Sequence, residues 1–500
     1  MNHLFDQIRQ RAPDSAAPFI ATPAGRTISY NDLFAATARM ASALDELGVV
    51  PGDRVAVQVE KSPEALVLYL ACVRAGAVFL PLNTAYTQRE VAWFLGDAEP
   101  RVVVAAPERR AEIGSVAGGA RVETLGVDAD GTLMDRARVA AAGFADSERG
   151  PNDLAAILYT SGTTGRSKGA MLTHENLASN ARTLVEAWRF TRDDVLIHAL
   201  PVFHTHGLFV GTNVTLFAGA SMHFLPRFDA GAVVAAFGRA TVLMGVPTFY
   251  VRLVQHPGIT PETVRGMRLF ISGSAPLLAE TFAAFHARTG HAILERYGMT
   301  ETNMNTSNPY DGERRAGTVG PPLAGVDVRI ADPATGAPLA GGKIGMIEVR
   351  GPNVFSGYWR MPEKTAEEFR SDGFFITGDL GVVDADGYVA IVGRSKDLII
   401  SGGFNVYPKE VETEIDLVPG VVESAVIGLP HADFGEAVTA VVVPGGGDVT
   451  EAAVLAALDG RLASYKQPKR VVFVPELPRN TMGKVQKAGL RQAYADLYRR

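Results

Sequence analysis

Short apolar runs alternate with longer amphipathic segments over most of the chain. Runs rich in Val, Ile and Leu occur at Asp53–Glu60, Arg101–Ala106, Leu154–Thr160, Asp194–Leu200 and Leu269–Gly273. Segments between such runs, for example Tyr30–Leu47, have the spacing of amphipathic helices. Strands that alternate with helices in this way predict an α/β fold of layered subdomains with mostly parallel sheets.

The longest apolar run, Ala65–Leu82, contains Arg74, Gly76 and Pro81. A membrane-spanning helix would not tolerate these residues at its middle. We expect a helix, a glycine turn and a buried strand.

The pattern changes twice toward the C-terminus. After Gly320, short β-rich runs separated by Gly and Pro predict a small antiparallel or barrel-like unit. The last hundred residues predict a helix–strand–strand–helix–strand series, enough for a separate α+β domain. The charged, glycine-flanked segment Gly393–Gly403 lies between them. We therefore expect a large N-terminal domain at 1–395 and a small C-terminal domain at 396–500.

The amino-acid composition narrows the range of possible functions. Five hundred residues with 47% apolar and 20% charged side chains indicate a well-packed protein of at least two domains. A net charge of -6 gives no reason to expect nucleic acid or a membrane surface as a partner. Cys72 is the only cysteine, which excludes an internal disulfide and a cysteine-based zinc site. Because no apolar leader follows the N-terminus, we expect a cytoplasmic protein.

A polar, glycine-rich segment, YTSGTTGRSKG at Tyr159–Gly169, separates a predicted buried strand from AMLTHENLASNA, which we expect to be helical. Gly, Ser and Thr are common in ordinary surface turns. Backbone N–H groups freed by glycine, together with Lys168 and the hydroxyls, also form a cradle for phosphate oxygens. The segment is not a Walker A loop, because two residues separate Gly165 from Lys168. Taken alone, it leaves both interpretations open.

Each of the other polar segments, taken alone, also allows a functional and a purely structural interpretation. In ERYGMTET (Glu295–Thr302) an aromatic ring can stack on a base and a carboxylate can hold Mg²⁺, but a strand-to-loop turn is the simpler explanation. Asp379 and Arg394 could clamp ribose hydroxyls or be solvated surface charges. Lys484, in PRNTMGKVQK near the C-terminus, could be catalytic or merely solubilising.

All of these segments occur in one chain and in this order. The combination resembles the adenylate-forming superfamily of acyl-CoA synthetases, luciferases and peptide-synthetase adenylation domains, over nearly the whole chain. Within it the chain looks most similar to malonyl-CoA synthetases, on the stretches RATVLMGVPTFYVRL, FISGSAPL, ERYGMTETNMNTSNPYDG and LPRNTMGKVQK.

The resemblance implies a two-step reaction that uses ATP, Mg²⁺ and coenzyme A. A carboxylate attacks the α-phosphorus of ATP, pyrophosphate leaves, and the CoA thiol then displaces AMP from the acyl adenylate. The implied nucleotide site is Thr160, Ser161, Gly162, Thr163, Thr164, Gly165, Lys168, Gly273, Ser274, Ala275, Glu295, Tyr297, Gly298, Thr300, Asp379 and Arg394.

Individual roles also follow from the resemblance. The loop from Thr160 to Lys168 would hold the β and γ phosphates, and Thr300 the α-phosphate. Glu301 would carry Mg²⁺. Tyr297 would lie against adenine, and Asp379 with Arg394 would fix the ribose. Lys484 would bridge the substrate carboxylate and the α-phosphate, where charge develops in the transition state.

In the family the small C-terminal domain is mobile and swings between the two half-reactions. The pivot position is Lys396 in this chain. One orientation would bring Lys484 to the reacting atoms. The other would present the CoA-side loop Ser401, Gly402 and Gly403, whose glycines let a pantetheine arm pass close to the backbone.

The acyl pocket of the family is lined by segments that in this chain are unusually polar. They contribute His204, His206, Arg252, Ser274, Asn303 and Met304. A second substrate carboxylate would lose its hydration on entry and would need a partner. Arg252 can grip a carboxylate bidentately, and His206 or Ser274 could add a hydrogen bond. The expected acid is malonate, with methylmalonate as a secondary substrate.

Simpler explanations exist for the same residues. Arg252 could be an exposed helix arginine, and spacing alone does not decide. His204 and His206 have no third ligand at suitable spacing, so we do not expect a zinc site; His204 would instead lie beside the reacting carboxylate. Met304 would form a pocket wall.

Other functions stay open. A short-chain monocarboxylate or aryl-acid CoA ligase would share every nucleotide residue. A non-catalytic adenylate-binding protein is disfavoured because Lys484 and Glu301 are both present. A carrier-protein thiol could replace free CoA, although no carrier domain is visible in this chain.

Overall fold

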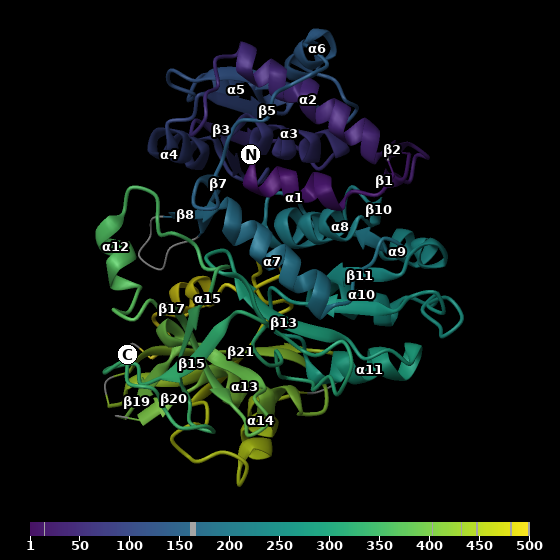
Figure 1. Cartoon of the computed structure of the whole chain (residues 1–500). Helices are drawn as coiled ribbons and strands as arrows, with labels where there is room; N and C mark the ends of the chain where they lie inside the picture. The colour runs from purple at the N-terminus through teal and green to yellow at the C-terminus, as the bar shows by residue number, and fades with distance from the viewer. Residues whose placement is uncertain are drawn as a thin grey trace. The chain divides into compact units, whose positions relative to one another are not determined.

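The computed structural model describes residues 1–14, 16–160, 167–402, 404–431, 433–446, 449–480 and 483–498. The chain divides into two compact bodies. The first comprises residues 1–327 and 349–375, and the second comprises residues 328–348 and 376–500. Figure 1 shows α/β elements through the first body, as the hydrophobic pattern predicted. The boundary at residue 395 stays a prediction.

One sheet of the first body contains the strand that precedes the glycine-rich segment. Its order is β6 (Arg121–Thr124), β5 (Val102–Ala105), β3 (Arg54–Gln58), β4 (Val78–Pro81), β7 (Leu154–Thr160) and β8 (Lys168–Thr173). The strands pair in parallel except β7 with β8, which form an antiparallel hairpin at the edge.

The second sheet of this body carries most of the other motifs. Its order is β14 (Asn303–Ser307), β13 (Leu294–Met299), β12 (Leu269–Ser272), β11 (Val242–Gly245), β9 (Val195–His198), β10 (Ser221–Phe224), β1 (Pro18–Ala21) and β2 (Thr27–Ser29). From β13 to β1 the pairing is parallel. The carboxyl ends of β9, β11, β12 and β13 therefore share one edge, where ligands bind in α/β sheets.

Several helices of the first body begin at a side-chain cap that the sequence supplies. Ser29 and Asp32 form a capping box at α2 (Tyr30–Glu46). The predicted helix, glycine turn and strand of the longest apolar run are confirmed: α3 (Pro63–Ala75) ends at Gly76, with φ 70°, and β4 follows. Other helices of this body are α1 (His3–Arg11), α4 (Gln88–Ala98), α5 (Arg110–Gly114), α6 (Thr132–Val139), α7 (His174–Ala187), α8 (Thr212–Ala218), α9 (Ala230–Ala236), α10 (Pro247–Gln255), α11 (Ala279–Thr289) and α12 (Pro362–Glu367).

One predicted element was partly wrong. The stretch AMLTHENLASNA does not begin as a helix, because Lys168–Thr173 is strand β8 and α7 starts only at His174. Thr173 and Asn176 form a capping box at this start. The backbone of β8 bonds to β7 on one side and to residues 356–359 on the other, and this pairing outweighs the helical spacing that follows.

Cys72 lies on α3 and is fully buried. Burial raises the pKa of its thiol well above the usual value. The thiol is therefore a packing group of the core.

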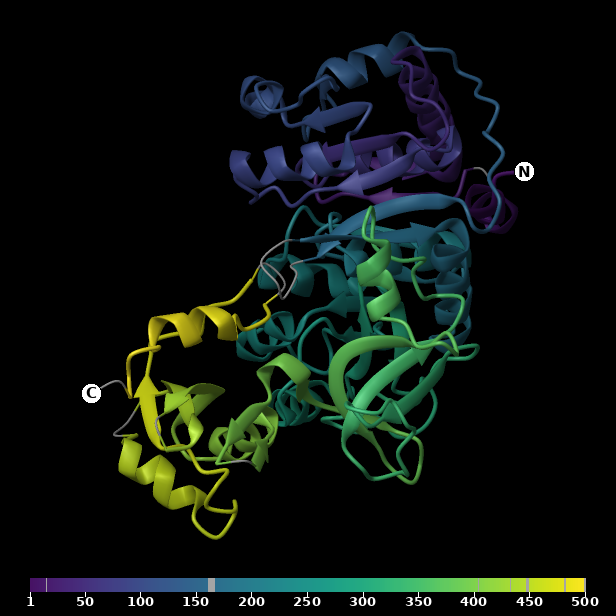
Figure 2. The ribbon, with the colours of Figure 1, turned by 90° about the vertical axis from the view of Figure 1, so that its left-hand side faces the viewer.

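The second body contains two sheets (Figure 2). One has the order β15 (Asp327–Ala331), β16 (Gly345–Arg350), β17 (Phe375–Val383) and β18 (Val389–Arg394). The other has the order β20 (Phe404–Val406), β19 (Ile399–Ser401), β22 (Gly435–Pro444) and β21 (Val421–His431), and β23 (Arg470–Phe473) pairs with β22. With α13 (Pro408–Asp416) and α14 (Glu451–Leu458) they confirm the predicted series; the β19–β20 hairpin and α15 (Lys487–Ala493) were not predicted.

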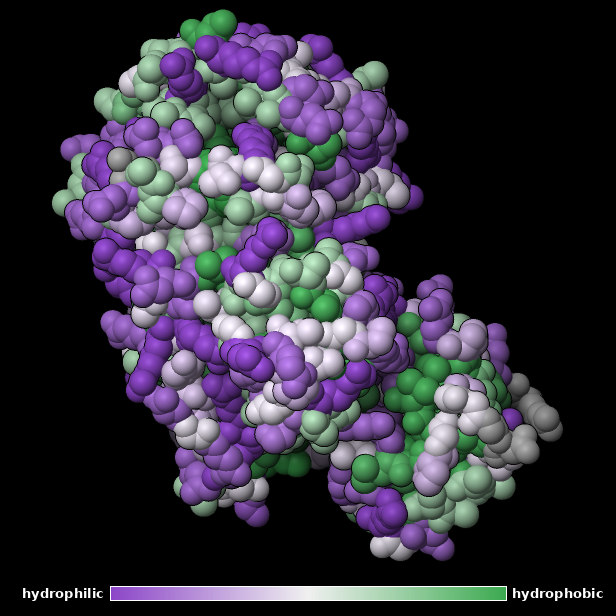
Figure 3. All heavy atoms as spheres, turned by 90° about the vertical axis from the view of Figure 1, so that its right-hand side faces the viewer, coloured by the Kyte–Doolittle hydropathy of each residue, from purple (hydrophilic) through white to green (hydrophobic). Residues whose placement is uncertain are grey.

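The surface mixes polar and apolar side chains on the face drawn in Figure 3. Exposed apolar residues of the second body include Leu417 and Val422. Among the described helices, none combines the length and the apolar character needed to cross a bilayer.

Candidate active site

The glycine-rich segment connects the two strands of the β7–β8 hairpin. Thr160 and Lys168 are cross-strand partners, and the Thr160 hydroxyl lies 3.4 Å from the Lys168 carbonyl oxygen. The predicted phosphate-binding residues Ser161, Gly162, Thr163, Thr164 and Gly165 lie outside the described residues. The hairpin therefore fixes where the segment leaves and rejoins the sheet.

A chain of polar contacts links Lys168 to Glu301. The Lys168 ammonium lies 2.8 Å from Glu368 Oε1 and 4.0 Å from the centre of the Tyr358 ring. The Tyr358 hydroxyl lies 2.7 Å from Glu368 Oε2 and 3.1 Å from Glu301 Oε1. Because a hydroxyl has one proton, it can donate to only one carboxylate at a time. The structure thus brings together a predicted phosphate ligand and the predicted Mg²⁺ ligand.

Electrostatics favour one protonation state each for Tyr358 and Glu368. Burial, and next the charge of Glu301, raise the pKa of Tyr358 far above its usual value, so the phenol stays protonated. Burial opposes ionisation of Glu368, but hydrogen bonds from Lys168 and Tyr358 outweigh it and lower the pKa of that carboxyl. Tyr358 and Glu368 were not predicted; Glu368 lies 200 residues from Lys168, and no local pattern marks it.

Tyr358 is expected to set the Mg²⁺ requirement of the reaction. Tyr358→Phe would leave Glu301 and Glu368 without the hydroxyl between them, and loss of such an outer-shell partner typically reduces metal affinity or activity about 10–100-fold. The measurement is the Mg²⁺ concentration that gives half-maximal AMP release.

Tyr30→Phe is the matched control, since its buried hydroxyl donates to the carbonyl of Ala220, which precedes β10 and so lies at the end of that strand opposite the carboxyl edge. It should lower stability by about 1 kcal/mol without changing the Mg²⁺ requirement. An unchanged requirement in Tyr358→Phe would show that the hydroxyl does not position Glu301.

The predicted acyl pocket begins after β9. Residues His206–Gly211 form a π-helix, a conformation often found at functional sites. Gly207 is required there, because an added side-chain carbon would lie 2.1 Å from the Pro201 carbonyl oxygen. His206 is buried, and its Nδ1 lies 3.2 Å from the Ser274 hydroxyl. Burial, and then the charge of Arg296, lower the pKa of His206, so the imidazole is neutral.

The structure brings His206 and Ser274 together, whereas Arg252 forms no hydrogen bond with either of them among the described residues. Ser274 follows β12 with a positive φ of 73°, and Arg252 is exposed on α10. Among the described residues, no hydrogen bond or ion pair holds the Arg252 guanidinium. A malonate-binding role for Arg252 stays a prediction.

The remaining motif residues of the first body lie around the β13–β14 hairpin. Tyr297 and Glu295 are buried, and Met304 is 2% exposed on β14. Gly298 permits the close approach of the two strands, since an added carbon would lie 1.8 Å from the Asn303 carbonyl oxygen and 2.6 Å from Met304 Cε. Met304 thus packs against the turn that leads to Thr300 and Glu301.

The second body brings together the other predicted group. Asp379 and Arg394 are cross-strand partners on β17 and β18, with Oδ1 and Nε 2.7 Å apart. Lys396 follows in a 3-10 turn, Ser395–Asp397. Ser401 ends β19, Gly402 has φ 57°, and Gly403 lies outside the described residues.

Two hydrogen bonds join the backbone of Lys484 to Asn480, one to its side chain and one to its backbone. The Lys484 N–H donates to Asn480 Oδ1, and the Lys484 carbonyl accepts from the Asn480 N–H, both at 2.9 Å. Although the residue as a whole is exposed, local desolvation and then the charge of Arg394 lower the pKa of Lys484 to about 8. The predicted ribose pair and the predicted catalytic lysine therefore influence each other electrostatically.

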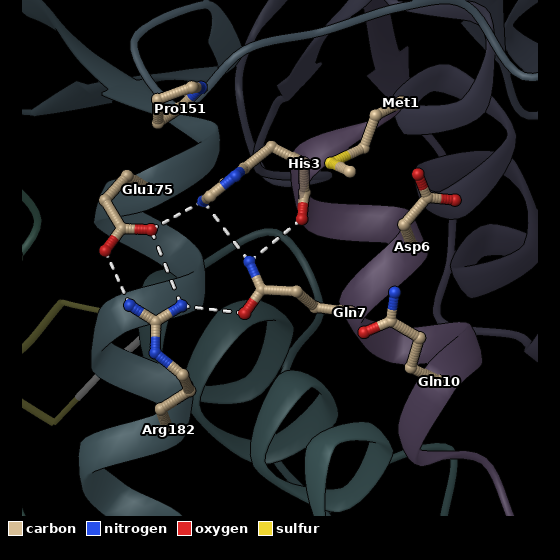
Figure 4. Close-up of a pocket in the computed structure, with 8 residues that line it drawn as sticks. All are labelled: Met1, His3, Asp6, Gln7, Gln10, Pro151, Glu175 and Arg182. Atoms are coloured by element: carbon tan, nitrogen blue, oxygen red, sulfur yellow. Dashed lines mark hydrogen bonds and ion pairs between the residues drawn. The ribbon is translucent and has the colours of Figure 1, made fainter.

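The first body has two surface pockets, which differ in how near they lie to the predicted site residues. One, of about 590 Å³, lies between α1 and α7 (Figure 4) and contains no predicted site residue. There the Glu175 carboxylate contacts both His3 and Arg182, at 2.6 and 2.5 Å, so its oxygens already have partners within the pocket. The other, of about 580 Å³, is lined by Tyr358 and by residues of α12, next to the Lys168–Glu301 chain of contacts.

Comparisons with known proteins identify one protein family for this chain. The profile of the AMP-binding enzyme family matches residues 5–359, and that of the AMP-binding enzyme C-terminal domain matches residues 410–484. The crystal structure of ATP-bound MatB from Rhodopseudomonas palustris is 64% identical, covers 100% of both chains and superimposes with a TM-score of 0.98.

The curated relatives are named for different acid substrates. A feruloyl-CoA synthase from Amycolatopsis sp is 38% identical over 94% of both chains. A malonate–CoA ligase from Arabidopsis thaliana is 35% identical over 89% of this chain and 79% of its own. These identities do not choose between aryl acid and dicarboxylate, but they agree with the profile match. The chain belongs to the AMP-binding enzyme family.

Proposed function

We propose that this protein joins malonate to coenzyme A with ATP, through malonyl adenylate, releasing AMP and pyrophosphate. The observation that carries the choice of acid is the buried polar lining of the pocket, where His206 bonds Ser274. An aryl or long-chain acid would leave His206 Nε2 and the nearby Ser272 hydroxyl, which are buried without hydrogen-bond partners among the described residues, still unpaired, at a cost of roughly 1–3 kcal/mol each. A methyl branch changes packing by about 1–3 kcal/mol, so methylmalonate is a secondary substrate.

In the first step a malonate oxygen attacks the α-phosphorus of ATP, and the bond to the β-phosphate oxygen breaks. We propose that Lys484 supplies positive charge to the carboxylate and the α-phosphate, and that Thr300 bonds the α-phosphate. The Asp379–Arg394 pair holds the ribose, and Tyr297 lies against adenine. Lys168 leaves Glu368 to bind the terminal phosphates; His204 lies beside the reacting carboxylate.

The residues fit a magnesium ion that arrives with ATP. Mg²⁺ in such sites is held by one or two carboxylates plus substrate phosphates, and Glu301 presents a carboxylate whose neighbour Tyr358 is a neutral donor. When bound, the ion would neutralise phosphate charge.

In the second step the CoA thiol attacks the acyl carbon and AMP leaves with the bonding electrons. We propose Lys396 as the pivot and Ser401–Gly403 as the loop beside the pantetheine arm. The single buried cysteine is consistent with a reducing cytoplasm, which we propose as the location.

The test is AMP release with ATP, Mg²⁺ and CoA across acetate, propionate, malonate, methylmalonate, succinate, benzoate and ferulate. We expect a strong preference for malonate. Preference for ferulate or benzoate would favour the aryl-acid alternative, which the feruloyl-CoA synthase relative keeps open. Absence of AMP with every acid would contradict the enzyme assignment.

Arg252→Ala is expected to reduce kcat/KM for malonate by about 10–100-fold and to change acetate turnover little, because hydrogen bonds to charged groups contribute about 1.5–3 kcal/mol. Arg265→Ala is the control, since Arg265 is another exposed arginine of the first body. Equal losses for malonate and acetate would remove Arg252 from the malonate site.

A further inference from the structure

Lys61 is a lysine of the first body that belongs to none of the predicted site motifs. It lies in the loop between β3 and α3, and its Nζ is 2.8 Å from the carbonyl oxygen of His198 and 3.0 Å from Nδ1 of the same residue. The Nζ also lies 4.3 Å from the centre of the Phe224 ring. Among the described residues, no carboxylate forms an ion pair with Lys61. Its partners are therefore a histidine and an aromatic ring at the carboxyl ends of β9 and β10.

The amine of Lys61 acts here as a hydrogen-bond donor. Although the residue as a whole is half-buried, local desolvation lowers the pKa of Lys61 well below its usual value. Both the ammonium and the neutral amine carry hydrogens, so both can donate to the carbonyl oxygen and to Nδ1 of His198. The contact thus holds the ring of His198 whichever way the amine is protonated.

His198 connects this amine to the π-helix His206–Gly211. The residue is 1% exposed, and its Nε2 lies 2.9 Å from the carbonyl oxygen of Gly207. A carbonyl can only accept, so Nε2 carries the hydrogen. Burial lowers the pKa of His198 well below its usual value, so the imidazole is neutral and its Nδ1 has a lone pair for Lys61. Lys61 therefore selects the one tautomer of His198 that can bond to Gly207.

The Gly207 carbonyl is an acceptor of the wide turn that defines the π-helix. It accepts the backbone N–H of Thr212, five residues along the chain, and the Thr212 hydroxyl at 3.1 Å, in addition to His198. His198 also packs against the far end of this helix, because a side-chain carbon added at Gly211 would lie 3.1 Å from His198 Nε2. Since π-helical turns are rare and short, these side-chain donors stabilise the turn against ordinary α-helical bonding.

The π-helix in turn determines where His206 points. His206 is the first residue of this helix, and its Nδ1 lies 3.2 Å from the Ser274 hydroxyl. A return to α-helical bonding would shift the register by one residue and turn His206 by roughly 100° about the helix axis. That rotation would take the imidazole away from Ser274 and from the proposed acyl pocket.

We propose that Lys61 and His198 are positioning residues of the acyl pocket. Lys61 fixes the tautomer of His198, and His198 holds the Gly207 carbonyl so that the π-helix directs His206 toward Ser274. The inference rests on the proposed function only in placing His206 beside the acid. It assigns no contact with the substrate to either residue.

The kinetic test compares Lys61→Met with Lys61→Arg. Methionine has no hydrogen to donate to His198, whereas arginine keeps the donors. Lys61→Met should lower kcat/KM for malonate by about 10-fold and leave KM for ATP within about twofold of wild type, because misplacing one group beside the acid leaves the nucleotide contacts intact. Lys61→Arg should retain kcat/KM for malonate within about threefold, since it preserves a hydrogen bond.

Substitutions of His198 separate its two nitrogens. His198→Gln places an amide N–H near the position of Nε2 and should keep most of the activity with malonate. His198→Asn reaches only the position of Nδ1 and should lose about 10-fold in kcat/KM, because the Gly207 carbonyl loses its donor. His223→Asn is the matched control and should behave as wild type, since His223 precedes Phe224 on β10 and points to the opposite face of the sheet.

A second measurement reads the tautomer directly. In nitrogen NMR spectra of protein with labelled histidines, the signals that disappear in His198→Gln belong to His198. The wild-type signals should show hydrogen on Nε2 alone, and Lys61→Met should show a mixture of the two neutral tautomers. A lysine with a merely structural role would lower Tm without moving these signals.

The inference fails if Lys61→Met leaves the His198 tautomer unchanged, or if it keeps wild-type kinetics with malonate. Equal losses in kcat/KM for malonate and for ATP would also overturn it, because they would indicate damage to the whole first body. Failure of Lys61→Met and of both His198 variants to fold would make the two residues structural. A wild-type enzyme without malonate preference would instead overturn the proposed function, and the same variants assayed with the preferred acid would still test the positioning role.

Discussion

Lys484→Met is expected to slow adenylate formation by about 10²–10³-fold, the usual effect of removing one preorganised group that stabilises developing charge. Methionine keeps most of the side-chain volume but cannot neutralise the carboxylate and the α-phosphate as they react. Binding of ATP should change little, because the effect belongs to the transition state. The measurement is malonate-dependent pyrophosphate release in a single turnover.

A second assay separates the two half-reactions. Thioester formation from prepared malonyl adenylate and CoA should proceed at nearly the wild-type rate, because Lys484 is proposed to act only in the first step. Lys343→Met, which changes an exposed lysine of the second body, is the control and should behave as wild type in both assays. Equal losses in both steps would indicate damage to the second body rather than loss of the catalytic charge.

Glu301→Gln is expected to be the other severe change, with a loss of about 10²-fold or more in AMP release at low Mg²⁺ and partial recovery at high Mg²⁺. Glutamine preserves the volume and can still accept from the Tyr358 hydroxyl, so the fold should persist. The experiment is a Mg²⁺ titration of AMP release.

Glu186→Gln, an exposed position on α7, should leave that titration unchanged. A Glu301→Gln enzyme with wild-type Mg²⁺ dependence would place the ion elsewhere. The effect should exceed that of Tyr358→Phe, because Tyr358 reaches the ion only through Glu301.

The fold was predictable where local pattern and tertiary packing agree. Leu154–Thr160 appears as β7 with the expected bounds, and Tyr30–Glu46 as α2 with its own capping box. The helix predicted for Ala170–Ala181 was wrong over Ala170–Thr173, because this edge strand is defined by its partner, β7, and not by its own spacing. The β19–β20 hairpin was missed for a related reason: each strand is only three residues long.

The site was predictable in its motifs and not in the contacts that surround them. Asp379 and Arg394 form the expected pair because β17 and β18 are consecutive strands. Tyr358 and Glu368 could not be found, since they reach Glu301 and Lys168 from distant parts of the chain. Lys61 and His198 were not singled out, because their contact joins segments 137 residues apart and is visible only in three dimensions.

The burial of Cys72 makes this protein convenient for fluorescence labelling. Its thiol is inaccessible within α3 and stays protonated, so maleimide dyes should leave the wild-type chain unmodified. Cysteines introduced at one exposed position of each body would then be the only reactive thiols, without first mutating the native one. Paired reporters placed in this way would follow the proposed domain swing in real time, during turnover and in an otherwise unaltered sequence.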